Sequence, residues 1–440
     1  MRVVLITVGS RGDAEPFCSL ASELAECDHR VDLFLQMDMR HLAPKEAAAE
    51  TNVTVHELPF SSQDFYQFVA SPSHGSGHPN PRVKFVGIIA DVIAELLLPC
   101  NSEVAAIVEG SDAVVASSLA RPLAIALGEK YGMPVCLVQL QPMIPTGEFP
   151  HYSNTDRCID AIIGKGQMKG EERKKNAATY WELERFQFDF LEERLSVTYS
   201  DLGLATAPDF SLYQDILSGS NDQFFAINAF SLEVVPLCRD GGMNISNVGP
   251  LADGYVPNDW SPPLDLVKFL ETCEEPPICI GYGSMSLDKG DVILETLESL
   301  KTKAVIVGPK EYFQGDSEWS HKNIFFVPSA PYAWLLPQCS MMFSHGGAGV
   351  VNATLRAGIP AIISPLMGDQ FFWAKLLEKK GLGVQAGGSL PTITKNEMVD
   401  AIKRGLKCTE SSKQLGGTIQ NGTQGVKMLV CILESKCERN

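Results

Sequence analysis

The chain has 440 residues, about three times a usual domain length, so two large domains or three small ones are expected. A hydrophobic content of 45% and a charged content of 20% are ordinary for a globular protein. The net charge of −17 argues against nucleic acid as a partner and against electrostatic docking on anionic membranes, because both bind basic surfaces.

The N-terminus enters a strand directly, with the sequence MRVVLITVG and no charged-then-apolar leader. No apolar run reaches the length of a membrane span. The twelve cysteines are spread along the chain and form no CxxC pair, so reduced thiols are expected. These features predict a soluble, cytoplasmic protein without stable membrane insertion.

The first half alternates strands with helices. A strand is expected over 3–8, followed by a turn, Gly9 to Asp13, and a helix over 15–27. Further strands are expected over 31–35, 53–58, 113–116 and 134–139. This alternation predicts a parallel sheet covered on both faces. Because sites in such sheets lie beyond the carboxyl ends of the strands, the turn at Gly9 to Asp13 is well placed for chemistry.

The stretch 164–194 is strongly charged and carries five aromatic residues. It predicts one or two amphipathic helices, which either pack as an insertion or use their aromatic rings to wall an apolar pocket. Further on, the proline-rich segment 257–263 indicates a domain linker. A second unit then begins, with a helix over 266–270 and strands over 278–281, 304–307, 324–327 and 341–343.

The segment 341–370 is the most informative part of the chain. A short apolar strand leads through His345 and a run of small residues, Gly346, Gly347, Ala348 and Gly349, into a helix-compatible stretch. Such a junction binds anions, because unpaired amides and the positive end of the helix dipole face the turn. A second strand, PAIISPL, ends at Asp369 and Gln370, which suit sugar hydroxyls. Phosphate at one strand end and a polyol at the next describe a nucleotide sugar.

The ordered set SHGGAG, RAG, P and GDQ resembles the donor-binding signature of the UDP-glycosyltransferase superfamily, in its sterol 3-beta-glucosyltransferase and antibiotic glycosyltransferase branch. The resemblance extends to GSRGD near the N-terminus, to VGPL and W.PP.DL..FL at the linker, and to GSM at the head of the second unit. The family's first histidine is Ser344 here, and its threonine after GAG is Val350. The region 55–230 offers no matching motif.

The resemblance implies the α/β fold called GT-B, with two Rossmann-like domains facing across a cleft. The expected division is an acceptor-binding domain over 1–235, a linker over 236–264 and a nucleotide-sugar-binding domain over 265–415. A final helix within 416–440 is expected to cross back to the first domain, as it does in the family.

The implied activity is that of an inverting hexosyltransferase. It would move a hexose, most simply glucose, from a UDP-sugar to a hydroxyl of a small apolar acceptor such as a sterol, a lipid or a natural-product aglycone. An alcohol needs a general base, and Asp13 matches the family position proposed for that base. Ser10, Arg11 and Gly12 form the acceptor-side turn around it. The alternative for Asp13 is a helix N-cap, and His29 is interpreted as structural.

On the donor side, the resemblance assigns the diphosphate to His345 and to the amides of Gly346–Gly349. Ser284 matches a family hydroxyl near the diphosphate, although it could instead cap a helix. Val327 and Trp334 lie where the family places the uracil pocket, although Trp334 could equally anchor the core. Asp369 and Gln370 would contact the hexose. The donor-binding residues that the resemblance implies are Ser284, Val327, Trp334, His345, Gly346, Gly347, Ala348, Gly349, Asp369 and Gln370.

No DxD sequence follows a strand, so no metal and no other cofactor is expected. The acid that grips the ribose in plant relatives is replaced by Ala353, which leaves the choice between UDP and dTDP open. Two other functions are compatible with a nucleotide-sugar site, namely a UDP-sugar 2-epimerase and a non-catalytic nucleotide-sugar-binding protein. The acceptor itself is not readable from the sequence.

Overall fold

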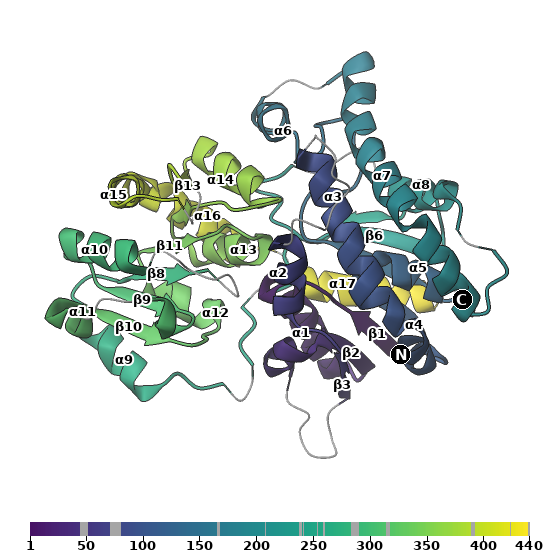
Figure 1. Cartoon of the computed structure of the whole chain (residues 1–440), viewed down its shortest axis with the longest axis horizontal. Helices are drawn as coiled ribbons and strands as arrows, with labels where there is room; N and C mark the ends of the chain where they lie inside the picture. The colour runs from purple at the N-terminus through teal and green to yellow at the C-terminus, as the bar shows by residue number, and fades with distance from the viewer. Residues whose placement is uncertain are drawn as a thin grey trace. The chain divides into compact units, whose positions relative to one another are not determined.

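The computed structural model describes the chain except residues 45–51, 71–80, 165–167, 207, 237–239, 241, 253, 258–259, 283–289, 314–316, 389–391, 423 and 439–440. The chain forms two compact units. The first comprises Met1–Ala252 and Gln424–Asn440, and the second comprises Asp253–Thr423. Figure 1 shows a parallel sheet flanked by helices in each unit.

The first unit is built on a seven-stranded sheet, ordered β3-β2-β1-β4-β5-β6-β7, in which every pair is parallel. Its strands are β1 (Arg2–Ile6), β2 (Arg30–Gln36), β3 (Val53–Leu58), β4 (Ala113–Ser117), β5 (Val135–Gln139), β6 (Phe224–Asn228) and β7 (Ile245–Asn247). The order reverses between β1 and β4, and the carboxyl ends beside such a switch point are where open α/β sheets bind ligands.

Helices and short helical turns cover this sheet. They are α1 (Arg11–Glu26), η1 (Met37–Leu42), α2 (Ser62–Ala70), α3 (Pro81–Val92), η2 (Ile93–Leu97), η3 (Leu98–Cys100), α4 (Asn101–Val108), α5 (Arg121–Tyr131), α6 (Thr155–Ile163), α7 (Glu171–Asp201), α8 (Phe210–Ser218) and α17 (Gly425–Cys437).

The charged stretch predicted as one or two helices is a single long helix, α7. Its aromatic residues divide between two environments. Tyr180 and Phe188 are buried, and Phe188 belongs to the main core cluster of the first unit. Phe190 is 36% exposed and its ring lies 6.2 Å from that of Phe186. The buried rings agree with the packed-insertion interpretation of this segment.

The second unit contains a six-stranded sheet, ordered β10-β9-β8-β11-β12-β13, again with every pair parallel. Its strands are β8 (Ile278–Gly281), β9 (Ala304–Val307), β10 (Ile324–Val327), β11 (Met341–Ser344), β12 (Ala361–Ile363) and β13 (Gly383–Gln385). The order reverses between β8 and β11, so the small-residue turn after β11 lies beside a second switch point.

The helices of the second unit are α9 (Leu264–Glu271), α10 (Gly290–Leu300), η4 (Lys310–Tyr312), α11 (Glu318–Asn323), α12 (Tyr332–Leu335), η5 (Leu336–Gln338), α13 (Ala348–Ala357), α14 (Gln370–Lys379), α15 (Lys395–Gly405), η6 (Leu406–Cys408) and α16 (Thr409–Gln420). α16 packs against α13. The helices approach closely, since a Cβ on Gly416 would lie 2.5 Å from the Cα of Gly358.

The predicted strands are confirmed in both units, and three further strands are present. β6, β7 and β13 were not expected. β7 lies inside the range 236–264 assigned to the linker, and α16 continues past residue 415, where the second domain was expected to end. β7 is short and is held by pairing with β6. α16 is largely polar and packs against α13.

The last helix, α17, belongs to the first unit and packs against α1. His29 Nε2 lies 2.9 Å from Glu434 Oε1 of this helix. Lys436 Nζ donates a hydrogen bond of 2.6 Å to Asn244 Oδ1, just before β7. His29 therefore helps to hold α17, which is a structural role.

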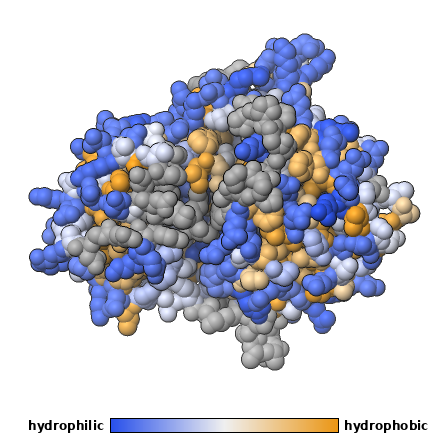
Figure 2. Space-filling view, in the orientation of Figure 1, coloured by the Kyte–Doolittle hydropathy of each residue, from blue (hydrophilic) through white to orange (hydrophobic). Residues whose placement is uncertain are grey.

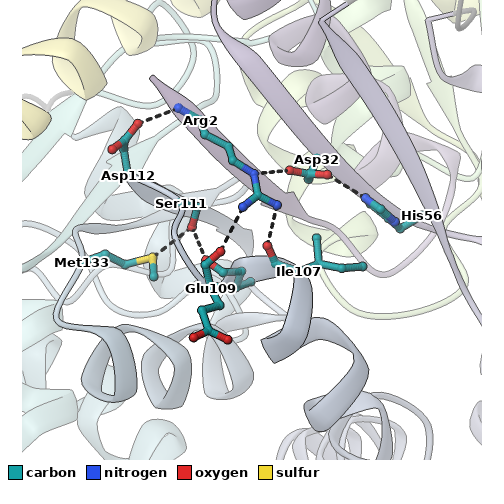
Figure 3. A network of polar contacts seen from close by, with 9 residues as sticks. Arg2, Asp32, His56, Ile107, Glu109, Ser111, Asp112 and Met133 are labelled. Atoms are coloured by element: carbon teal, nitrogen blue, oxygen red, sulfur yellow. Dashed lines mark hydrogen bonds and ion pairs between the residues drawn. The ribbon is translucent and has the colours of Figure 1, made fainter.

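A polar network joins the three strands β1, β2 and β3 on the side away from the β1–α1 junction (Figure 3). Asp32 accepts hydrogen bonds from Arg2 Nε at 2.9 Å and from His56 Nε2 at 2.8 Å. Arg2 also donates to the carbonyls of Ile107 and Glu109, which ties the end of α4 to β1. The hydrogen bonds from His56 and Arg2 lower the pKa of Asp32 despite its partial burial.

The surface of the first unit carries an apolar region over α3 (Figure 2). Val83, Phe85, Val86 and Ile89 of this helix are only half-buried. Within the described part of the chain, no helix combines the length and the apolarity that a membrane span requires.

Candidate functional site

Asp13 lies at the β1–α1 junction, in the first turn of α1. The helix begins at Arg11, with Ser10 as its N-cap. The predicted turn over Gly9 to Asp13 was therefore wrong for its last three residues, which are helical. The interpretation of Asp13 as an N-cap was also wrong, because it occupies the third helical position. The local rule that decides this is the capping box, in which the N-cap residue and the third residue of the helix bond reciprocally.

The Asp13 carboxylate folds back over the residues before the helix. Its Oδ2 atom accepts hydrogen bonds from Ser10 N at 2.7 Å and from Ser10 Oγ at 2.9 Å. Gly9 has a φ of +140°, and a Cβ on it would lie 2.3 Å from Asp13 Oδ2. Only glycine permits both this backbone conformation and this close approach.

Burial raises the pKa of Asp13, and the two hydrogen bonds from Ser10 oppose the shift without cancelling it. A carboxylate whose pKa is raised towards the working pH is a stronger base than an ordinary aspartate. Arg11, two residues away, is paired with Glu15 through contacts of 2.6 and 2.7 Å. Its charge is therefore engaged on the helix surface.

The second candidate region is the β11–α13 junction. α13 begins at Ala348, and its N-cap is Gly347, which has no side chain to cap the helix. The first amides of an α-helix have no partner within the helix, so those of Ala348 and Gly349 are available to an anion. Gly346 has a φ of +85°, and a Cβ there would meet Ile363 at 2.4 Å. Ser344 Oγ accepts a hydrogen bond of 3.2 Å from Gly346 N, which supports the turn.

His345 borders this turn. Its Nε2 atom would lie 2.8 Å from a Cβ on Gly347, so the imidazole covers the start of α13. Its Nδ1 atom is buried and has no hydrogen-bond partner among the described residues. Burial lowers the pKa of His345 from 6.5 to about 4, so the ring is neutral at pH 7. A neutral imidazole is not repelled by the positive end of the helix dipole, as an imidazolium would be, and it can still donate one hydrogen bond.

Asp369 and Gln370 lie at the start of α14. Asp369 Oδ2 accepts a hydrogen bond of 2.9 Å from Trp373 Nε1, one helical turn later. Gln370 is 7% exposed, and its Oε1 accepts from the amides of Leu366 at 2.7 Å and Met367 at 3.0 Å. Protein groups thus hold one polar atom of each side chain. This fixes the orientation of both residues at the end of the PAIISPL segment.

The other predicted donor residues have separate places in the second unit. Val327 is the last residue of β10 and is buried. Trp334, on α12, packs half-buried against the same core cluster, with its ring 5.2 Å from that of Trp260. This contact agrees with the core-anchor interpretation of Trp334. Ser284 lies outside the described residues.

Several supporting residues were not identified from the sequence. Gln36, at the end of β2, accepts a hydrogen bond from Gly9 N, and Ser117, at the end of β4, accepts one from Val8 N. Thr7 Oγ1 donates to the carbonyl of Asp13. These residues follow no motif, because they meet only when the strands align. Trp373 could have been found, since it lies four residues after Asp369 on one helix face.

The eleven cysteines in the described part of the chain are free thiols. Within those same residues, no group of three or more histidine, cysteine, aspartate or glutamate side chains is arranged to hold a metal ion.

Comparison with known proteins gives three consistent results. Residues 293–415 match the family described as "Erythromycin biosynthesis protein CIII-like, C-terminal domain". The chain is 27% identical over 417 residues to the sterol 3-beta-glucosyltransferase UGT80B1 of Arabidopsis thaliana. That alignment covers 87% of this chain and 59% of UGT80B1, so the chain spans less than two thirds of the length of this relative.

Two solved structures share the fold across the whole chain. The glycosyltransferase of kitacinnamycin aligns with a TM-score of 0.64 and 16% identity, covering 99% of both chains. The glycosyltransferase SsfS6 of Streptomyces sp. SF2575, complexed with thymidine diphosphate, aligns with a TM-score of 0.63 and 16% identity, also covering 99% of both. The fold is GT-B, and the sequence is similar to sterol 3-beta-glucosyltransferases over 87% of this chain.

Proposed function

We propose that the protein is an inverting glycosyltransferase that moves a hexose, most simply glucose, from a UDP-sugar to a hydroxyl of an apolar acceptor. The observation that carries the proposal is the presence of two chemically complementary junctions in one chain. One holds a carboxylate of raised pKa at the end of β1, and the other presents helix amides and a neutral histidine at the end of β11. The similarity to sterol 3-beta-glucosyltransferases supports the same reaction class and an acceptor such as a sterol, a lipid or a natural-product aglycone.

The proposed reaction is a single displacement at the anomeric carbon. The acceptor oxygen forms a bond to that carbon while the bond to the diphosphate oxygen breaks, and the configuration inverts. Asp13 takes the proton of the acceptor hydroxyl, and the bonding electrons leave with UDP. General-base assistance of this kind contributes about 10²- to 10⁴-fold to a rate.

The departing diphosphate gains negative charge as the bond breaks. We assign its stabilisation to the amides at the start of α13 and to an N–H of His345. Asp369 and Gln370 are proposed to hold the hexose, since protein contacts already orient both side chains. Because these groups supply the stabilisation, we expect transfer to proceed in the presence of a chelator.

A donor and acceptor screen tests the proposal. Purified protein would be incubated with UDP-glucose, UDP-galactose, UDP-GlcNAc or dTDP-glucose, with and without sterols, flavonoids and lipids, while nucleotide release and product are followed. Release that depends on one acceptor class is the expected result. Interconversion of UDP-sugars without acceptor would instead identify an epimerase, and tight nucleotide binding without turnover would identify a binding protein. Comparison of UDP-glucose with dTDP-glucose shows which nucleotide the protein prefers, a choice that Ala353 leaves open.

A further inference from the structure

Gln36 is the last residue of β2 and lies beside the β1–α1 junction. Its side chain is 2% exposed, and its Oε1 accepts a buried hydrogen bond of 2.7 Å from Gly9 N. The neighbouring backbone bond, from Thr7 N to Phe34 O, measures 3.3 Å. The Gln36 side chain therefore continues the β1–β2 pairing one step beyond the strands, into the turn that leads to α1.

Gly9 links Gln36 to Asp13, because it donates a hydrogen bond to the first residue and packs against the carboxylate of the second. Its Cα faces the carboxylate so closely that a Cβ would overlap Asp13 Oδ2, and its φ of +140° is open only to glycine. Gly9 has no side chain to limit its rotation. The hydrogen bond that Gly9 N donates to Gln36 Oε1 is thus the contact that fixes the Gly9 peptide plane from the β2 side, while the bond from Val8 N to Ser117 Oγ fixes Val8 from the β4 side.

We propose that Gln36 is a positioning residue for the general base, and that it acts by holding the Gly9 peptide against the Asp13 carboxylate. The inference rests on the proposed function for the role of Asp13, but the contact itself does not. Gln36 holds the junction closed around Asp13, which keeps the carboxylate buried and its proton affinity high. Loss of the contact lets the junction open to water.

The charged groups on the elements packed against α1 belong to the surroundings in which Asp13 titrates. The elements packed against α1 are β1, β2, β3, η1 and α17. Among their charged groups, Arg11 pairs with Glu15, Asp38 with Ser62, Arg40 with Glu57, Asp32 with Arg2 and His56, Glu434 with His29, and Lys436 with Asn244. The same elements and the turn after α1 also carry Glu23, Glu26, Asp28, Arg30, His41 and Lys427. Burial raises the pKa of Asp13, and the hydrogen bonds from Ser10 oppose that shift.

Two substitutions separate the parts of the side chain. Gln36→Met keeps the length and removes the acceptor for Gly9 N. Gln36→Glu keeps an oxygen there, and because Gln36 Nε2 has no partner among the described residues, the change breaks no protein hydrogen bond. Gln139→Met is the matched control. Gln139 is also a buried glutamine at the end of a strand, β5, and its Oε1 accepts instead from Ser118 Oγ at 2.8 Å.

The first experiment needs no activity. Amide hydrogen exchange is followed by mass spectrometry on a peptide covering residues 7–17, at a temperature where each variant is fully folded. We expect Gln36→Met to lose protection in this peptide, Gln36→Glu to retain it, and Gln139→Met to behave as the wild type there. Unchanged protection in Gln36→Met would overturn the proposal even if the protein proves to be a transferase.

The second experiment measures how the Gln36 substitutions change catalysis and the titration of Asp13. We expect kcat to fall roughly 10- to 100-fold in Gln36→Met, because small displacements of reacting groups have large effects, with the KM for the donor unchanged. The acid limb of the pH–rate profile should move to lower pH in Gln36→Met as Asp13 becomes hydrated. It should move to higher pH in Gln36→Glu, since a second carboxylate lies nearby. A loss of folded protein alone would lower the rate without shifting the acid limb in either variant.

If the wild type shows no transfer, the proposed function fails. In that case we would measure the pKa of the Asp13 carboxyl by ¹³C NMR in place of the pH–rate profile. The spectrum of Asp13→Asn assigns the signal. The same directions of shift are expected. A pKa that is equal in the wild type and in both Gln36 variants would overturn the positioning role.

Discussion

The β1–α1 and β11–α13 junctions have the same topology but opposite polar architecture. In the first, Val8, Gly9 and Ser10 each donate a backbone hydrogen bond to a protein side chain. In the second, the N-cap of the helix is Gly347, which has no side chain to cap it, and His345 Nδ1 has no partner among the described residues. One junction is closed around its own carboxylate, whereas the other leaves its donors for an anion.

The difference shows how one strand–turn–helix unit can serve two chemical purposes. A carboxylate at the third helical position satisfies the helix start from within and is itself held in place. A run of small residues leaves the same amides exposed to a ligand of opposite charge. The sign of the pKa shifts follows from burial alone, which raises the pKa of Asp13 and lowers that of His345.

The largest expected effect separates the two junctions by function. Asp13→Asn should lower transfer by about 10²- to 10⁴-fold, because the amide cannot accept the acceptor proton. UDP affinity, measured by calorimetry, should stay within about twofold, since the proposed diphosphate site is the β11–α13 junction and Asp13 belongs to the other unit. A variant that keeps most of its turnover would show that Asp13 only supports the helix.

The matched control for this change is Asp32→Asn. Asp32 is a carboxylate of β2, in the same unit as Asp13, and is held by Arg2 and His56 in the network away from the junction. Its replacement should lower the unfolding temperature while leaving turnover per folded molecule unchanged. Equal losses of turnover in both variants would point to a general effect on the first unit.

A smaller effect is expected at the open junction. His345→Ala should weaken UDP binding by about 10- to 100-fold, because a hydrogen bond to a charged group contributes about 1.5–3 kcal/mol. Calorimetric titration measures the loss directly. His29→Ala is the control, since His29 contacts Glu434 in the first unit, and it should bind UDP as the wild type does. Equal affinity in His345→Ala and the wild type would remove His345 from the donor site.

The smallest effect concerns stability and pH. The pKa of His345 is lowered from 6.5 to about 4, so between these values the unfolded chain binds a proton that the folded chain does not. The stability contribution of this group should therefore be complete above pH 6.5 and fall as the pH drops towards 4, by roughly 3 kcal/mol at most. Denaturant unfolding of the wild type and His345→Asn, followed from about neutral pH down towards pH 4, measures the difference. Parallel curves for the two proteins would contradict the lowered pKa.

Local patterns in the sequence were sufficient for much of the fold. β3, β8, β9 and β10 have the predicted bounds. β8, β9 and β10 are short apolar runs, whereas β3, VTVHEL, begins with the apolar–polar alternation of a half-buried strand. The SHGGAG junction was also predictable, since glycines at fixed spacing ahead of a helix carry the physics of anion binding in the chain itself. The family resemblance added the GT-B fold, which the structural neighbours share.

Other features were decided only by tertiary structure. β7 is a strand because Asn228 and its neighbours in β6 pair with it, not because Ile245–Asn247 favours extended backbone. The helix start at Arg11, rather than at Glu15, depends on the reciprocal contacts of Ser10 and Asp13. These are contacts that propensity alone ranks poorly.

What the sequence by itself determined is the identity of the chemical groups, namely a carboxylate after β1 and a histidine with small residues after β11. The tertiary structure decided their state. Burial by surrounding elements shifts both pKa values, and Gln36 and Ser117 reach the first junction only because β2 and β4 flank β1 in the sheet. Such groups are distant in sequence and carry no shared pattern, so they become neighbours only through the strand order.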